Sequence, residues 1–203
     1  KFIEDDEGFE EAKDRLSFSP LTAKIAAIGV LDYDSKKGAV YVNSEKDSGT
    51  LSKEIEPGIQ VISGGEKDIV ERFWKLAEKY NIFITFNGRG FDAPFLMVRS
   101  AILEVKPTKN LMANRYLSLQ PFSTKHIDLL DQLSFYGASR TRSAFHFWAK
   151  AFNLPSPKEN GITGNDVKNL FDKGKLEEIA KYNLGDLKTT ALLYEKWEKY
   201  LNF

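Results

Sequence analysis

Acidic and hydroxyl side chains stand at two places in this chain with a spacing that suits metal-assisted chemistry. The first place is residues 87–92, NGRGFD, in which Asp92 follows a turn with two glycines. The second is residues 182–186, YNLGD, in which Tyr182 and Asp186 are four positions apart. On a helix, residues four apart share one face, about one turn from each other. A phenol and a carboxylate so placed can act together on one water and one cation.

The residues around Asp92 predict that it stands at the edge of a sheet. The run Ile82–Phe86 is short, apolar and partly β-branched, which is typical of a buried strand. Gly88 and Gly90 then allow a sharp reversal of the backbone and the close approach of another molecule. Pro94 falls in the first turn of a predicted helix. Asp92 therefore follows the carboxyl end of a strand, where α/β sheets bind ligands. The alternative for Asp92 is a helix N-cap, a position at which Asp is also favoured.

Apolar residues at helical spacing predict a long closing helix over residues 175–201, which contains Tyr182 and Asp186. Gly185 inside it costs about 1 kcal/mol relative to Ala, so it is most useful where another group approaches closely. Tyr-x3-Asp alone occurs by chance in many helices, as a buried tyrosine beside an unrelated surface acid. Its combination with a strand-turn Asn-x3-Phe-Asp upstream is much rarer.

The remaining segments predict an α/β protein with a mixed sheet. Residues 22–32 and 39–42 predict two strands of an antiparallel hairpin, whereas the polar stretch 46–56 predicts a loop or ragged edge. An irregular segment is expected over 106–125. Further strands are expected over 59–62 and 126–129, and further helices over 66–80, 130–136, 143–152 and 165–173. We find no repeat or long linker, so we expect one domain over residues 1–203.

Composition restricts the classes of function. With 203 residues, 42% hydrophobic and 29% charged, the chain has the composition of a globular protein. It has no cysteine and no apolar run near the roughly 20 residues that cross a bilayer, so we expect a cytoplasmic protein without a membrane contact. Its formal net charge of zero argues against gripping long duplex by the phosphates. A small, local contact with a strand end suits this charge better.

The two motifs, 87–92 and 182–186, resemble the second and third motifs of the DEDDy subgroup of DnaQ-like 3′–5′ exonucleases. The chain is most similar to the proofreading domain of family B DNA polymerases and its stand-alone bacterial and archaeal relatives. The resemblance extends over most of the chain, including HIDLLDQLSFYGA around Asp128 and the closing IAKYNLGDLKTTALLYEKW. It implies an RNase H-like mixed sheet flanked by helices.

The resemblance also implies a set of roles. Asp92 and Asp186 would be ligands of Mg²⁺ or Mn²⁺ in a two-metal site, and Tyr182 would orient the attacking water. Asn87 and Phe91 would contact the substrate end, and Asp128 would have a structural role. The implied substrate is the 3′ end of single-stranded or frayed nucleic acid, with DNA favoured. A polymerase or repair partner is compatible with the sequence but is not identified by it.

One family feature is missing from this sequence. The first motif, Asp-x-Glu at the end of a central apolar strand, has no counterpart before the strand predicted over 22–32, so two of the four expected carboxylates are absent. We expect an upstream segment to carry that strand, in which case the printed chain alone would be inactive. Three alternatives stay open: a catalytically degenerate module that binds nucleic acid or a partner, an RNase H-like nuclease that cuts internally, and an α/β domain with chance motifs.

Overall fold

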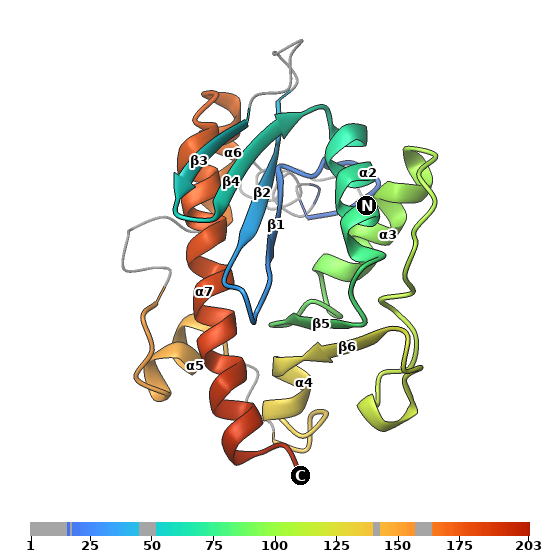
Figure 1. Cartoon of the computed structure of the whole chain (residues 1–203), viewed down its shortest axis with the longest axis vertical. Coiled ribbons are helices and arrows are strands. Elements are labelled where there is room, and N and C mark those ends of the chain that lie inside the picture. Colours follow the sequence, from blue (N-terminus) through green and yellow to red (C-terminus); the bar gives the residue numbers. More distant parts are fainter. Residues whose placement is uncertain (1–15, 17, 45–51, 140–142, 157–163) are drawn as a thin grey trace, which may run out of the picture.

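The computed structural model describes residue 16 and residues 18–44, 52–139, 143–156 and 164–203, and it contains two β-sheets with helices around them (Figure 1). The strands of the first sheet are β1 (Ala27–Leu31), β2 (Gly38–Asn43), β3 (Ser52–Glu56) and β4 (Ile59–Gly64). Their order is β1-β2-β4-β3. The predicted hairpin is confirmed, because β1 and β2 pair antiparallel; β2 and β4 are parallel.

Of the loop or ragged edge predicted over 46–56, the loop is wrong for Ser52–Glu56, which forms the edge strand β3, while residues 45–51 lie outside the described residues. This strand pairs antiparallel with β4, and its register shifts between Glu54 and Glu56. It is mostly exposed and charged, and charged side chains are how natural sheets protect an outer edge from further pairing. Such a strand lacks the apolar alternation that marks a half-buried one. Strand β4 likewise extends to Gly64, two residues beyond the strand predicted over 59–62.

The second sheet is a parallel pair, β5 (Ile82–Thr85) and β6 (Lys125–Asp128), with Thr85 opposite Asp128. The connection between them contains α3 (Asp92–Ile102) and then an irregular stretch in which only the short 3₁₀ helix Leu117–Leu119 is regular, as predicted. Within the described residues, β1 pairs only with β2 and β5 pairs only with β6. Each therefore has one edge without a strand partner.

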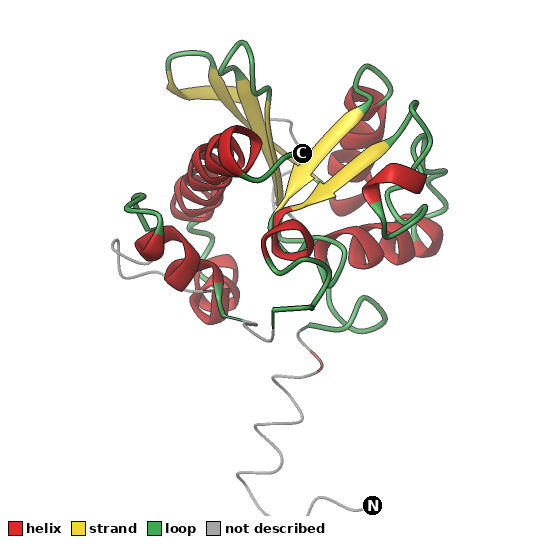
Figure 2. Ribbon diagram, turned by 90° about the horizontal axis from the view of Figure 1, so that it is seen from below, coloured by secondary structure: helices red, strands yellow, loops and turns green. Residues whose placement is uncertain are grey.

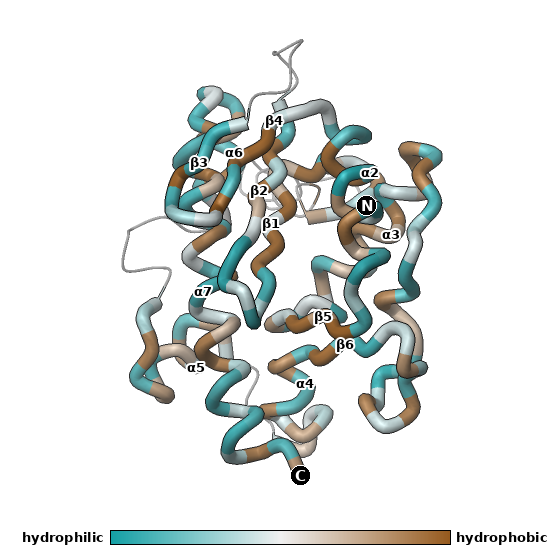
Figure 3. Tube along the Cα trace, viewed as in Figure 1, coloured by the Kyte–Doolittle hydropathy of each residue, from teal (hydrophilic) through white to brown (hydrophobic). Residues whose placement is uncertain are grey.

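The other helices are α2 (Glu66–Ala77), α4 (Leu129–Leu133), α5 (Phe145–Ala151), α6 (Gly164–Asp172) and α7 (Leu176–Tyr200). Helices α2 and α7 cover opposite faces of the first sheet, because Tyr41 of β2 belongs to a core with α2 residues while Val40 and Val42 pack with Ala180 of α7. Figure 2 shows the helices surrounding the two sheets. Apolar residues gather in the strands (Figure 3), and those of α2 and α7 pack against the first sheet.

Helix α7 continues past the first sheet to the second. Its later residues Leu193 and Trp197 pack with Ile127 of β6 and Leu129 of α4. The whole arrangement is a mixed α/β fold with a four-stranded mixed sheet, which confirms the fold class at that level. None of the helices in the described part of the chain is both long and apolar enough to cross a membrane.

Candidate active site

The turn between β5 and α3 has a backbone that few sequences allow. Asn87 adopts a left-handed conformation with φ of 57°, a region that Asn enters more readily than most residues. A Cβ on Gly88 would lie 2.3 Å from Oγ1 of Thr85, so this position requires glycine. The turn is closed by hydrogen bonds from Gly90 N to Asn87 O (3.0 Å) and from Ala93 N to Gly88 O (2.7 Å). The backbone conformation thus favours Asn at position 87, and the lack of space beside Thr85 requires Gly at position 88.

Asp92 is the first residue of α3 and not its N-cap. The N-cap is Phe91, and no side chain makes a capping hydrogen bond there. The capping alternative for Asp92 is therefore wrong. The helix N-terminus still favours a negative charge at this position, because the first backbone N–H groups carry partial positive charge.

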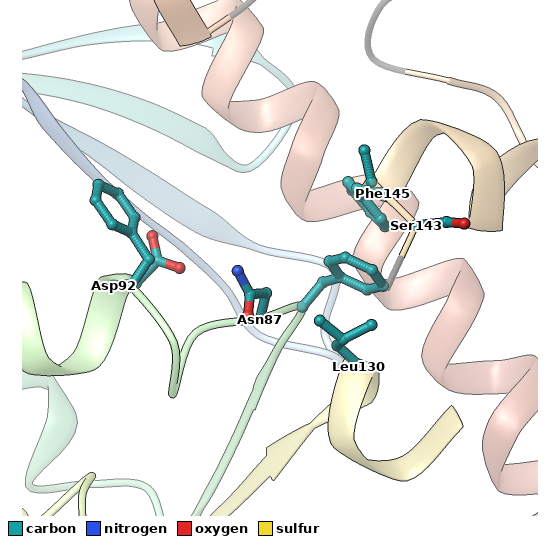
Figure 4. Close-up of a pocket in the computed structure, with 8 residues that line it drawn as sticks. Asn87, Asp92, Leu130, Ser143 and Phe145 are labelled. Carbon is teal, nitrogen blue, oxygen red and sulfur yellow. The ribbon is translucent and has the colours of Figure 1, made fainter. Parts of the chain in front are cut away.

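A pocket of about 550 Å³ lies beside the turn and brings together Asn87, Phe91 and Asp92 (Figure 4). The rest of its lining comes from elsewhere in the chain: Phe86, Leu130, Ser143, Ala144 and Phe145. The rings of Phe86 and Phe145 stack with centroids 4.6 Å apart. The sequence analysis did not predict that Leu130 and residues 143–145 would form the wall of the pocket opposite the turn. The aromatic-rich segment 143–152 was its only signal, and such segments are more often core.

Tyr182 and Asp186 lie on α7, outside the lining of that pocket, and Asp186 interacts with Asp92 by charge. Burial is the largest cause that raises the pKa of Asp186 to about 6, and the negative charge of Asp92 raises it further. A hydrogen-bonding interaction with Tyr182 opposes this rise. The charge of Asp92 therefore acts on the carboxylate of Asp186.

Asp92 has a similarly raised pKa. Solvent reaches its side chain, yet the surrounding protein removes enough hydration to raise the pKa to about 6, with the charge of Asp128 adding to the effect. Its own backbone N–H lowers the value in part. Desolvation and a like charge both disfavour the ionised form, and a nearby cation would reverse both effects.

The pKa of Tyr182 is raised to about 12, first by burial and then by the charge of Asp186 and a hydrogen-bonding interaction with it. The phenol is consequently protonated throughout the neutral range. It can hold a water or a phosphate oxygen but cannot accept a proton as a general base there.

The carboxylates offer part of a metal site. Carboxylate oxygens are the ligands that Mg²⁺ and Mn²⁺ prefer, so Asp92 and Asp186 suit such an ion chemically. Within the described ranges, however, no group of three or more His, Cys, Asp or Glu residues could hold a metal ion. The two acids fit a divalent ion but require further ligands to complete its coordination.

Two glycines near α7 differ in what surrounds them. A Cβ on Gly29 of β1 would lie 1.7 Å from Oδ1 of Asn183, so this glycine lets α7 approach β1 closely. No pattern in the sequence predicts that contact. Gly185, for which a close approach was expected, has no described atom from outside its own helical turn and chain neighbours within 4 Å of the corresponding position. That expectation finds no support in these contacts.

Comparison with known proteins gives a family match over residues 20–202. The matching family is described as a predicted 3′–5′ exonuclease related to the exonuclease domain of PolB. The match covers most of the chain and includes both motifs. It confirms the resemblance drawn from the motifs.

Individual relatives are DNA polymerases of archaea. The chain is 23% identical over 177 residues to the DNA polymerase of Pyrococcus glycovorans, covering 79% of the chain and 21% of the polymerase. It is 26% identical over 137 residues to the enzyme of Desulfurococcus sp. (strain Tok), covering 62% and 17%, and 25% identical over 182 residues to that of Pyrococcus horikoshii, covering 79% and 13%. The chain thus spans about a fifth or less of the length of these relatives.

Proposed function

We propose that this chain removes nucleotides from the 3′ end of single-stranded or frayed nucleic acid, with DNA favoured. The chain belongs to the family of predicted 3′–5′ exonucleases related to the exonuclease domain of PolB. The observation that carries this proposal is the meeting of Asn87, Phe91 and Asp92 in one pocket while Asp92 is coupled by charge to Asp186. That arrangement combines a place for a substrate end with paired carboxylates.

In this proposal Asp92 and Asp186 hold Mg²⁺ or Mn²⁺. Their raised pKa values support the assignment, because each carboxylate is desolvated and repelled by a negative neighbour until a cation is present. Bound divalent ions would supply an activated water and stabilise the charge on the leaving 3′ oxygen. The helix N-terminus at Asp92 favours the same negatively charged groups.

Tyr182 holds the attacking water in this proposal. Its hydroxyl remains protonated at neutral pH and interacts with Asp186 from one turn earlier on the same helix. It can thus orient a water beside that carboxylate without removing a proton from it. The expected contribution is one of orientation, for which a misplacement of about 1 Å can cost roughly 100-fold in rate.

The pocket suits the terminal nucleotide. Its volume of about 550 Å³ lies within the range usual for small-molecule sites, and the rings of Phe91 and Phe145 form part of its wall. Stacking of bases on aromatic rings tolerates any sequence, because every base has a π-face. Asn87 can hydrogen-bond a sugar or phosphate oxygen of the same nucleotide. The pocket therefore supports recognition of an end without recognition of a sequence.

The unpaired edges of β1 and β5 could bind an additional strand that carries the Asp-x-Glu motif. A strand hydrogen-bonded to both edges would join the two sheets into one. Residues i and i+2 of a strand point to the same face, so an Asp-x-Glu on it would present both carboxylates together. We propose that a further segment of the protein provides this strand.

A second candidate function has one observation in its favour. The described residues do not assemble three metal-binding side chains in one place. A protein without the additional strand would keep the pocket and the aromatic rings but lack the complete metal site. It would then act as a nucleic-acid-binding or partner-docking module of the same fold.

The test is digestion of a 5′-labelled single-stranded oligonucleotide with Mg²⁺ or Mn²⁺, using protein from the complete coding sequence. We expect stepwise shortening from the 3′ end, at least about 100-fold slower with Asp92→Asn. Asp172→Asn is the matched control, because Asp172 is an exposed acid paired with Lys168 on the surface of α6. A 3′-blocked oligonucleotide identifies an internal cutter, which would ignore the block. Binding without any shortening in either ion favours the binding module.

A further inference from the structure

The carboxylate of Asp128 connects the two walls of the pocket. Asp128 is the last residue of β6, its exposed fraction is 3%, and it also caps α4. Its Oδ1 accepts hydrogen bonds from the backbone N–H groups of Asn87 (2.8 Å) and Leu130 (3.0 Å). Its Oδ2 accepts one from Arg89 N (2.9 Å). Asn87 and Leu130 line the pocket from different elements, so one side chain fixes both.

The strand register explains how Asp128 reaches a turn about 40 residues earlier. Thr85 and Asp128 are partners at the ends of the parallel pair β5 and β6. The chain leaves β5 through the turn at this same level, so the N–H groups of Asn87 and Arg89 can point at the neighbouring carboxylate. A second cross-strand contact, between Oγ1 of Thr85 and Nε2 of His126 (2.8 Å), supports the same register.

The turn needs such an anchor because its backbone is unusual. Asn87 has a positive φ, a conformation that costs less for Asn than for most residues with a side chain but is still uncommon. Hydrogen bonds to an ionised acceptor are stronger than those between neutral groups, so a buried carboxylate holds this conformation well. Arg89 adds a second anchor, since its guanidinium donates to the carbonyl oxygens of Leu111 (3.2 Å) and Ala113 (3.5 Å). Asp92 follows only three residues after Arg89.

We infer that Asp128 is a positioning residue, whose three hydrogen bonds fix the turn before Asp92 and the start of α4 and thereby set the position of the Asp92 carboxylate. This inference rests on the proposed function for its effect on catalysis. Its structural part concerns only the backbone of Asn87, Arg89 and Leu130. The two parts can be measured separately.

Two substitutions separate the roles of this carboxylate. Asp128→Asn leaves one acceptor oxygen and places an amide, which only donates, toward one of the turn N–H groups. Asp128→Ser keeps a good N-cap for Leu130 but is too short to reach the turn, so it also guards against simple loss of α4. The matched control is Asp131→Asn, which removes the same charge three residues later, where Asp131 pairs with the half-exposed Arg115 and does not contact the turn.

The first measurement is amide hydrogen exchange at Asn87 and Arg89 by NMR on protein from the complete coding sequence. Both Asp128 variants should exchange faster at these two amides than wild type, and Asp131→Asn should not. The second measurement is kcat, KM and the Mn²⁺ concentration for half-maximal rate. We expect kcat to fall and the Mn²⁺ requirement to rise by roughly 10–100-fold, as for other residues that orient ligands, with KM changed less.

Unchanged exchange at both amides, or faster exchange with wild-type kcat and Mn²⁺ requirement, would overturn the inference. If wild-type protein has no exonuclease activity, the proposed function fails, and Mn²⁺ binding is followed instead by paramagnetic broadening of resonances near Asp92. Weaker Mn²⁺ binding by Asp128→Ser than by Asp131→Asn then supports the positioning role. Equal binding refutes it.

Discussion

Removing the side chain of Glu66 should destabilise this protein more than removing any exposed acid. Glu66 forms a bidentate ion pair with Arg99, at 2.6 Å and 2.8 Å, and the two side chains are 7% and 9% exposed. Its Oε1 also accepts a hydrogen bond from Ile25 N (2.9 Å), and Arg99 donates to Pro20 O (3.2 Å). The pair therefore fastens α2, α3 and the segment that enters β1 to one another.

The expected loss in the free energy of unfolding follows from the groups that Glu66→Ala leaves buried without a partner. Breaking a buried pair by removing one partner costs about 3–5 kcal/mol, because the other charge stays buried without its counterion. Ile25 N also loses its acceptor. A native protein is stable by only about 5–15 kcal/mol, so the loss is a large fraction of the total. With a urea dependence of about 2 kcal/mol per molar, the unfolding midpoint should fall by about 2 M.

The assay is urea unfolding followed by circular dichroism, with Glu56→Ala as the control. Glu56 pairs with Lys188 at the surface, where both side chains are nearly half exposed, and such pairs contribute at most about 1 kcal/mol. The double variant Glu66→Leu with Arg99→Met should recover most of the loss, since a buried ion pair can be replaced by apolar side chains. A loss below about 1 kcal/mol for Glu66→Ala would refute the reasoning.

Three further predictions concern the site. Gly29→Ala should destabilise the protein by about 1–3 kcal/mol, because the new methyl group would overlap Oδ1 of Asn183; adding Asn183→Ala should restore part of the loss in the same urea assay. In EDTA, wild type should lose stability relative to Asp92→Asn/Asp186→Asn as the pH rises from about 4 to 7. The pKa values of Asp92 and Asp186 in the folded state, near 6, exceed the usual 3.8, so between these values the folded state binds more protons than the unfolded state. The stability that this proton binding gives the wild type is lost as the pH rises above about 6. Melting temperatures of both proteins at each pH measure this difference. Tyr182→Phe should lower kcat about 100-fold without changing the shape of the rate profile from pH 7 to 9, because a phenol with a pKa of about 12 stays protonated. If the wild-type rate shows an inflection between about pH 7 and 9 and Tyr182→Phe does not, the proposed role of Tyr182 is wrong.

The sequence predicted the elements whose signals are local. The spacing of apolar residues was enough for α2 and α7, and the strand-turn-helix order was enough to place Asn87, Phe91 and Asp92 together. These residues lie within six positions of one another, so the short-range conformation of the backbone decides where they go.

Contacts between distant segments could not be predicted from the sequence. Leu130 and Phe145 complete the pocket from elements that follow β6, and nothing in their own spacing marks them as neighbours of Asn87. Gly29 resembles any glycine in a strand until α7 is seen to pack against it. Such contacts depend on strand register and helix crossing, which one sequence does not specify by pattern alone.

The two sheets are held together by side chains on both faces and not by backbone pairing within the described residues. On one face, Phe83 of β5 packs into the core that contains Ile69 of α2. On the other, α7 packs its Leu184 with the first sheet and its Leu193 with the second. Asp92 belongs to the second sheet through its turn, and Asp186 lies on α7 between the two packed regions. Their separation is therefore fixed by side-chain contacts, among them the ion pair of Glu66 and Arg99, and not by a ladder of backbone hydrogen bonds. It follows that a strand paired with both open edges would do more than add two carboxylates, because it would also lock the spacing of the two already present.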